Sequence, residues 1–126
     1  MRIGVIGAGK IGGNAARLLA DAGHEVLLSF SRDPSRLADR ATAIGPRART
    51  GTAAEAAAFG DVVILSVPWS AIPAALEEAG PLDGKILIDT TNHFGDLEGL
   101  TTAQHNQQRV PGARLRGCWV RGGCCG

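Results

Sequence analysis

Short apolar runs alternate with helical patterns along the first ninety residues of the chain. The runs are rich in branched residues and bounded by glycine or proline, which predicts strands at 3–6, 24–28, 48–50, 61–67 and 85–89. Between them, apolar residues recur at helical spacing and predict helices at 11–22, 35–44, 52–59 and 69–79. Because strands and helices alternate, we predict an α/β fold with a doubly wound parallel sheet and right-handed crossovers.

The first predicted strand runs into the sequence Gly7-Ala-Gly-Lys-Ile-Gly12, which has the spacing G-x-G-x-x-G. In this motif Gly7 permits a tight turn, Gly9 lets the backbone approach a pyrophosphate, and Gly12 lets the next helix pack on the strand. The N–H groups and the positive dipole end of that helix then face the phosphates. A structural turn without a ligand is the alternative, since the chain has 18 glycines. The place of the motif between a strand and a helix favours a dinucleotide site.

The end of the second predicted strand bears on the choice of dinucleotide. NAD-binding domains usually place an acidic residue about 20 residues past the glycine motif, where it binds the ribose 2′-hydroxyl. Here the chain reads Ser29-Phe30-Ser31-Arg32. Two hydroxyls and a guanidinium can bind a 2′-phosphate, and no carboxylate repels it, which favours NADP over NAD. A solvated loop is the alternative, and Asp33 with Pro34 predicts a cap for the next helix.

Two further polar segments follow buried strands of the predicted sheet. Ligands of such sheets bind beyond the carboxyl ends of the strands, so Ser66 to Trp69 and Asp89 to Asn92 are expected in the same crevice as the glycine motif. We expect the first segment near the middle of the cofactor and the second near the nicotinamide. The alternatives are a helix-packing role for Trp69 and a turn network for Asp89 to Asn92. His93 is either a proton donor or acceptor or an exposed loop residue.

Composition excludes several other functions. A net charge of +1 gives no reason to expect nucleic acid or a membrane surface as partner. No apolar run approaches the roughly 18 residues of a membrane span, and the N-terminus has no signal-peptide pattern, so a cytoplasmic location is expected. The three cysteines lie in the last nine residues, as Cys118, Cys124 and Cys125. Their spacing fits neither a zinc site nor a disulfide framework, and we predict no metal.

Taken in order, the motifs Gly7-x-Gly9-x-x-Gly12, Ser29 to Arg32, Val67-Pro68-Trp69 and Asp89 to Asn92 resemble the NADP-dependent oxidoreductases of coenzyme F-420, a deazaflavin. The resemblance covers about residues 1 to 114. It implies a Rossmann domain that binds NADP(H) and, in the family, transfers hydride between NADP and F-420. A small-molecule cofactor and a homodimer are the partners it implies.

The resemblance also assigns roles to residues. The glycine segment would hold the pyrophosphate. The 2′-phosphate would be bound by Ser31 and Arg32, with help from Ser29. The nicotinamide site would be lined by Val67, Pro68 and the Asn92 region. Where family members commonly have Asn, this chain has Phe30. The implied cofactor-binding residues are Gly7, Gly9, Lys10, Ile11, Gly12, Ser29, Ser31, Arg32, Ser66, Val67, Pro68, Trp69 and Asn92. No catalytic acid or base is predicted, because hydride transfer between two bound cofactors needs positioning rather than proton transfer.

The end of the chain departs from the family pattern. The resemblance implies a further strand after Arg114, but residues 115–126 are a mixture of glycine, arginine, cysteine and tryptophan without a strand or helix period. We therefore predict an NADP-binding Rossmann domain at 1–114 and an atypical tail at 115–126 that is non-native or disordered. The rest of the sheet and the C-terminal domain, which complete the F-420 site and often the dimer in the family, are expected to be absent. An evolved metal or redox tail is the alternative.

The sequence leaves two other functions open. One is a nucleotide-sensing module without catalysis, which usually carries an acidic residue at the end of the second strand and so fits Ser31-Arg32 poorly. The other is an NADPH reductase of a small carbonyl, imine or metal-chelate substrate, because the glycine motif and a phosphate-binding segment are widely shared.

Overall fold

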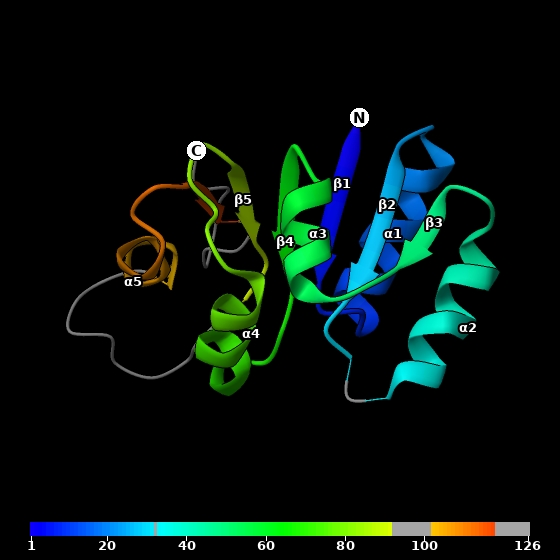
Figure 1. The fold of residues 1–126 in the computed structure, drawn as a ribbon, viewed down its shortest axis with the longest axis horizontal. Helices are drawn as coiled ribbons and strands as arrows, with labels where there is room; N and C mark the ends of the chain where they lie inside the picture. Colours follow the sequence, from blue (N-terminus) through cyan, green and yellow to red (C-terminus); the bar gives the residue numbers. More distant parts are fainter. Residues whose placement is uncertain (32, 92–101, 118–126) are drawn as a thin grey trace, which may run out of the picture.

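In the computed structural model, residues 1–31, 33–91 and 102–117 are described, and they form one parallel sheet with helices on both faces (Figure 1). The strand order is β3-β2-β1-β4-β5-β6, and every pair is parallel. The strands are β1 (Arg2–Ile6), β2 (Glu25–Ser29), β3 (Ala48–Thr50), β4 (Val62–Leu65), β5 (Ile86–Asp89) and β6 (Arg114–Gly117). The helices are α1 (Lys10–Asp21), α2 (Pro34–Ile44), α3 (Ala53–Phe59), η1 (Trp69–Ala71), α4 (Ile72–Ala79) and α5 (Thr102–Arg109). The predicted doubly wound α/β fold is confirmed.

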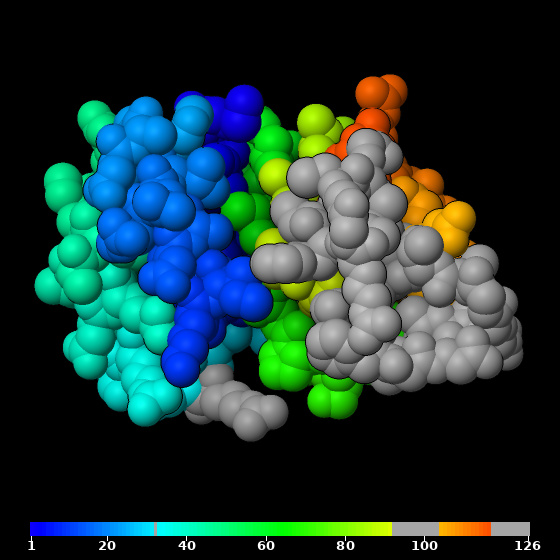
Figure 2. Space-filling model, turned by 180° about the vertical axis from the view of Figure 1, so that it is seen from behind, coloured from blue at the N-terminus to red at the C-terminus, as the bar shows by residue number. Residues whose placement is uncertain are grey.

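Two apolar layers hold the helices on the sheet. On one face α3 and α4 bury alanines and Ile72 against side chains such as Leu65 and Leu87. On the other face α1 and α2 pack against side chains such as Val5 and Leu28. Seen from behind, α1 in blue and α2 in cyan form the outer surface over this second layer (Figure 2). Because both faces of β1, β2 and β4 are covered, these strands are almost continuously apolar, as parallel strands usually are.

Most predicted boundaries agree with the structure to within one or two residues. The main difference is β4, which was predicted to run to Val67 and ends at Leu65. Leu65 is the last residue of β4 paired with β1, opposite Ile6, so Ser66 and Val67 leave the sheet beside the glycine turn. The helix predicted from Trp69 begins as the short 3₁₀ segment η1 and continues as α4, with Pro73 in its first turn, where proline is tolerated.

The C-terminal part of the fold corrects the sequence analysis twice. Helix α5 was not predicted, because its sequence has no apolar stripe and its buried side chain is Asn106. A strand beyond residue 114 was judged to have no sequence support, yet β6 pairs with β5 from Arg114 to Gly117 and buries Leu115. At 115–117 the chain therefore continues the sheet, where a tail without strand structure was expected. Residues 118–126, with the three cysteines, lie outside the described residues.

Candidate functional site

The turn between β1 and α1 has the geometry that the glycine motif predicts. Gly7 has a φ of +104°, and a Cβ there would overlap the carbonyl oxygen of Ser66. A Cβ at Gly12 would overlap the carbonyl oxygen of Gly7, so only glycine lets α1 approach the strand so closely. Gly9 differs, because a Cβ there meets nothing within 4 Å. Open space therefore lies above the backbone where α1 begins.

That open space belongs to a cavity of about 240 Å³ at the carboxyl ends of β1, β2 and β4. The glycine turn, the end of β2, helix α2 and the segment after β4 all contribute to its walls. Its lining residues are Gly7, Ala8, Gly9, Phe30, Ser31, Arg36, Arg40, Ser66, Val67, Pro68 and Ala71. The structure thus brings together six of the residues that the sequence analysis selected: Gly7, Gly9, Ser31, Ser66, Val67 and Pro68.

Other selected residues lie elsewhere. Ser29 is fully buried and its hydroxyl donates to the carbonyl oxygen of Val5 at 2.8 Å, so it braces β2 against β1 rather than lining the cavity. Lys10 and Ile11 are exposed on the first turn of α1, and Gly12 packs against the strand. The side chains of Lys10 and Ile11 do not line the cavity. The backbone N–H groups of Lys10, Ile11 and Gly12 belong to the first turn of the helix, where N–H groups have no partner within the helix.

The indole of Trp69 faces α5. Its ring centroid lies 5.4 Å from that of His105, and the guanidinium carbon of Arg109 lies 5.9 Å from the indole centroid. These contacts agree with the helix-packing alternative for Trp69. Arg32, Asn92 and His93 were also selected from the sequence and lie outside the described residues.

Two arginines of α2 line the cavity and were missed by the sequence analysis. Arg36 and Arg40 are four residues apart, so they lie on the same side of the helix, and both reach the cavity. Within the described residues, neither forms an ion pair with a carboxylate, and no carboxylate lines the cavity. Arg36 lies near enough to the Asp33 carboxylate to help lower its pKa, but among the described residues neither guanidinium is held in an ion pair, so both can bind an anion. The four-residue spacing of two arginines on the helix after the second strand was the signal that could have identified them.

The start of α2 is fixed by Asp33, as predicted. Its carboxylate accepts hydrogen bonds from the backbone N–H of Ser35 at 3.0 Å and from the Ser35 hydroxyl at 2.6 Å. These bonds, with that hydroxyl contributing most, lower the pKa of Asp33 below its ordinary value. Asp33 therefore caps the helix, which gives α2 a defined beginning next to the cavity.

Phe30 has an unusual backbone conformation. Its φ of +56° is left-handed, a region that side chains other than glycine and asparagine rarely adopt. Asparagine tolerates this conformation better than phenylalanine does, so the backbone at Phe30 is strained. Phe30 lines the cavity and packs against the apolar layer beneath α3 and α4.

The end of β5 carries a buried polar cluster. The Asp89 carboxylate is 1% exposed and accepts hydrogen bonds from the backbone N–H of Thr91 at 2.7 Å, from the Thr91 hydroxyl and from the side-chain amide of Asn106. Asn106 also donates to the Thr91 hydroxyl at 3.1 Å. For Asp89 to Thr91, this agrees with the turn-network alternative. The cluster ties the loop after β5 to helix α5.

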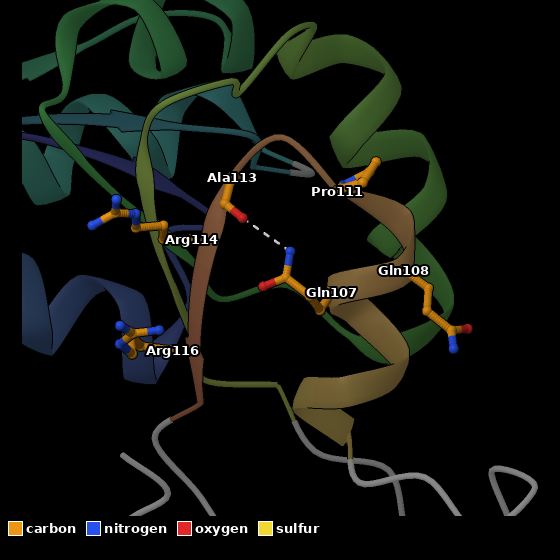
Figure 3. A pocket seen from close by; sticks show the side chains of 6 residues that line it. All are labelled: Gln107, Gln108, Pro111, Ala113, Arg114 and Arg116. Atoms are coloured by element: carbon orange, nitrogen blue, oxygen red, sulfur yellow. Dashed lines mark hydrogen bonds between the residues drawn. The ribbon is translucent and has the colours of Figure 1, made fainter.

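A larger hollow of about 610 Å³ lies between α5 and β6, but its polar groups do not converge (Figure 3). Arg114 and Arg116 point to one side of the strand, whereas Gln108 points away from it on the far side of the helix. The Gln107 amide is engaged with the backbone, donating to the carbonyl oxygens of Val110 and Ala113 and accepting from the N–H of Leu115. We therefore place the candidate site at the glycine turn.

The described residues show neither a metal-binding cluster nor a membrane-spanning helix. They contain no group of three or more histidine, cysteine, aspartate or glutamate residues placed to hold a metal ion. Among the helices described, none is both long enough and apolar enough to cross a membrane.

Comparison with known sequences decides the family. The family described as NADP oxidoreductase, coenzyme F420-dependent, matches residues 2–93, which include β1 to β5 and every part of the cavity. The chain belongs to this family. In this F420-dependent NADP oxidoreductase family member, the described residues make up the NAD(P)-binding Rossmann part. No curated protein matches the chain in sequence.

Solved structures of longer proteins share the fold. A protein from Arthrobacter sp. FB24 named as a "putative F420 dependent NADP-reductase" is 28% identical, with a TM-score of 0.76 over 91% of this chain and 60% of that one. A hypothetical protein from Sinorhizobium meliloti is 27% identical, with a TM-score of 0.79 over 93% of this chain and 60% of that one. A reductive aminase from Aspergillus terreus in complex with NADPH is 20% identical, with a TM-score of 0.70 over 92% of this chain and 39% of that one, and shows likeness of fold alone. The chain thus spans 60% of the length of the first two proteins.

Proposed function

We propose that the chain binds NADP(H) in the cavity at the glycine turn and forms the cofactor half of an oxidoreductase. The observation that carries the proposal is a cavity that combines the glycine turn with two arginines and no carboxylate among the described residues. An anionic dinucleotide fits such a site, because the helix start and the guanidinium groups each favour negative charge.

The pyrophosphate would lie above Gly9, where nothing within 4 Å of the backbone position hinders its approach. The backbone N–H groups of Lys10, Ile11 and Gly12 are at the start of α1, where N–H groups have no partner within the helix. They would donate to the phosphate oxygens, as helix N-termini do in other dinucleotide sites.

The adenosine 2′-phosphate would lie where β2 ends and α2 begins. Ser31, Arg36 and Arg40 line this side of the cavity, and Arg32 is proposed to join them. Ser29 is left out of this group because its hydroxyl already donates to Val5. A guanidinium makes paired hydrogen bonds to a phosphate, and NADH lacks that phosphate, so the site should prefer NADPH.

The nicotinamide would lie toward Ser66, Val67 and Pro68, and Asn92 is proposed to join them. NADPH, when bound, supplies a hydride from its nicotinamide ring. The protein's task is to hold that ring at a fixed distance from the acceptor and to exclude water. Coenzyme F-420 or a related acceptor is proposed as the partner from family membership, and its binding residues are not assigned.

Calorimetric titration of the folded chain with NADPH and, separately, with NADH tests the proposal. We expect binding of both with clear preference for NADPH, because the 2′-phosphate adds charged hydrogen bonds. If the protein is folded, as measured by circular dichroism, and binds neither nucleotide, the cavity is rejected as a dinucleotide site. Binding of both with equal affinity would reject the 2′-phosphate assignment alone.

A further inference from the structure

A glycine outside the recognised motif lies directly beneath one of the cavity arginines. Gly13 is buried in the first part of α1, and Arg40 is half-buried on α2. A Cβ built on Gly13 would overlap the Nη1 atom of Arg40 and come within 3.3 Å of its guanidinium carbon. The guanidinium therefore occupies the space that any other side chain at position 13 would take.

This contact determines where the charge of Arg40 lies. The helices α1 and α2 are in contact and share one apolar cluster, to which Ala16 and Ala20 of α1 and Leu37 and Ala41 of α2 contribute. Because Gly13 has no side chain, the Arg40 guanidinium lies against α1 at this position. Arg40 thereby lines the cavity beside the glycine turn. Because the overlap is with the end of a flexible side chain, a methyl group at position 13 would displace the guanidinium rather than the helix.

We propose that Gly13 is a specificity-determining residue, because it makes the space that lets Arg40 reach the 2′-phosphate of NADPH. This inference rests on the proposed function and adds to it. No carboxylate within the described residues pairs with Arg40, so its charge is free to meet the ligand. A larger residue at position 13 would turn that charge away from the cavity and reduce the preference for NADPH.

A double-mutant cycle of Gly13→Ala and Arg40→Ala tests the inference, with both nucleotides titrated into each variant. Arg40→Ala should weaken NADPH binding about tenfold or more, the scale of a hydrogen bond to a charged group, and leave NADH binding nearly unchanged. Gly13→Ala should produce a loss of the same kind. In the Arg40→Ala background, Gly13→Ala should have little further effect, because the group it displaces is already absent.

Stability measurements separate this effect from damage to the fold. Alanine has a higher helix propensity than glycine, so Gly13→Ala should not lower the thermal midpoint measured without nucleotide. Asn14→Ala, at the exposed neighbouring position of α1, is the matched control and should leave both affinities unchanged.

The outcomes distinguish the two proposals. Unchanged NADPH affinity in Gly13→Ala, or independent additive losses in the double variant, would overturn the Gly13 inference while the proposed function stands. Equal losses for NADPH and NADH would also overturn it, because the contact would then not concern the 2′-phosphate. If the parent chain binds neither nucleotide, both proposals fail.

Discussion

At the scale of single residues, the charge at the end of β2 decides which dinucleotide the site can accept. Ser31, Arg36 and Arg40 line the cavity there, and the nearby carboxylate of Asp33 is engaged in capping α2. An acidic residue directed into the cavity would repel a 2′-phosphate. Here the carboxylate of Asp33 accepts hydrogen bonds from Ser35 instead.

We expect Arg36→Ala to weaken NADPH binding by about 1.5–3 kcal/mol, the usual contribution of a hydrogen bond to a charged group, and to leave NADH binding nearly unchanged. Titration calorimetry with both nucleotides measures the two losses. Arg17→Ala is the matched control, because it removes the same charge from an exposed position on α1 where Arg17 pairs with Asp21 at 3.4 Å. A similar loss in the control would assign the effect to overall charge rather than to the cavity.

At the scale of secondary-structure elements, α5 and β6 are joined by a side-chain amide. Gln107 donates to the carbonyl oxygen of Ala113 at 2.9 Å (Figure 3). It also accepts from the N–H of Leu115 at 3.0 Å. A side-chain amide has the same donor and acceptor groups as a peptide, so Gln107 pairs with β6 much as a neighbouring strand would. This covers part of the outer edge of the sheet, which would otherwise expose unpaired backbone groups.

Gln107→Leu should therefore destabilise the chain by about 1–3 kcal/mol, because it leaves partly buried backbone groups of Ala113 and Leu115 without partners. Denaturant unfolding gives this difference in the free energy of unfolding. Gln108→Leu makes the same chemical change at the next, exposed position and should alter stability by less than about 0.5 kcal/mol. Equal effects of the two substitutions would contradict the role given to the Gln107 amide.

At the scale of the whole molecule, more of the fold than of the candidate site could be predicted from the sequence. Branched apolar runs and the glycine turn are local signals, so β1 to β5 and their helices were found from the sequence. Arg36 and Arg40 were missed because the cavity that they share with Gly7 forms only when α2 packs beside α1. Helix α5 was missed for a different reason. Asn106 and Gln107 hold it on the fold through hydrogen bonds rather than through apolar contacts, so its sequence shows no hydrophobic periodicity.

The whole molecule should also respond to the nucleotide as one unit. A ligand that binds only the folded state stabilises it by about 2.7 kcal/mol when its concentration is 100 times the dissociation constant. NADPH should therefore raise the thermal midpoint of the chain by several degrees, and more than NADH does at equal concentration. Differential scanning calorimetry at increasing nucleotide concentration measures both shifts.

Gly9→Val separates this response from the stability of the fold. Gly9 has a φ of −73° and a ψ of −161°, an extended backbone open to any residue, and a Cβ there meets nothing within 4 Å. The variant should therefore fold, with a small decrease in the midpoint without nucleotide because valine is a poorer N-cap of α1 than glycine. The valine side chain would occupy the space above the turn where the pyrophosphate is proposed to lie, so the shift caused by NADPH should disappear. A variant that folds and keeps the full shift would show that the nucleotide binds elsewhere on the molecule. The glycine turn would then be a structural feature of the fold alone.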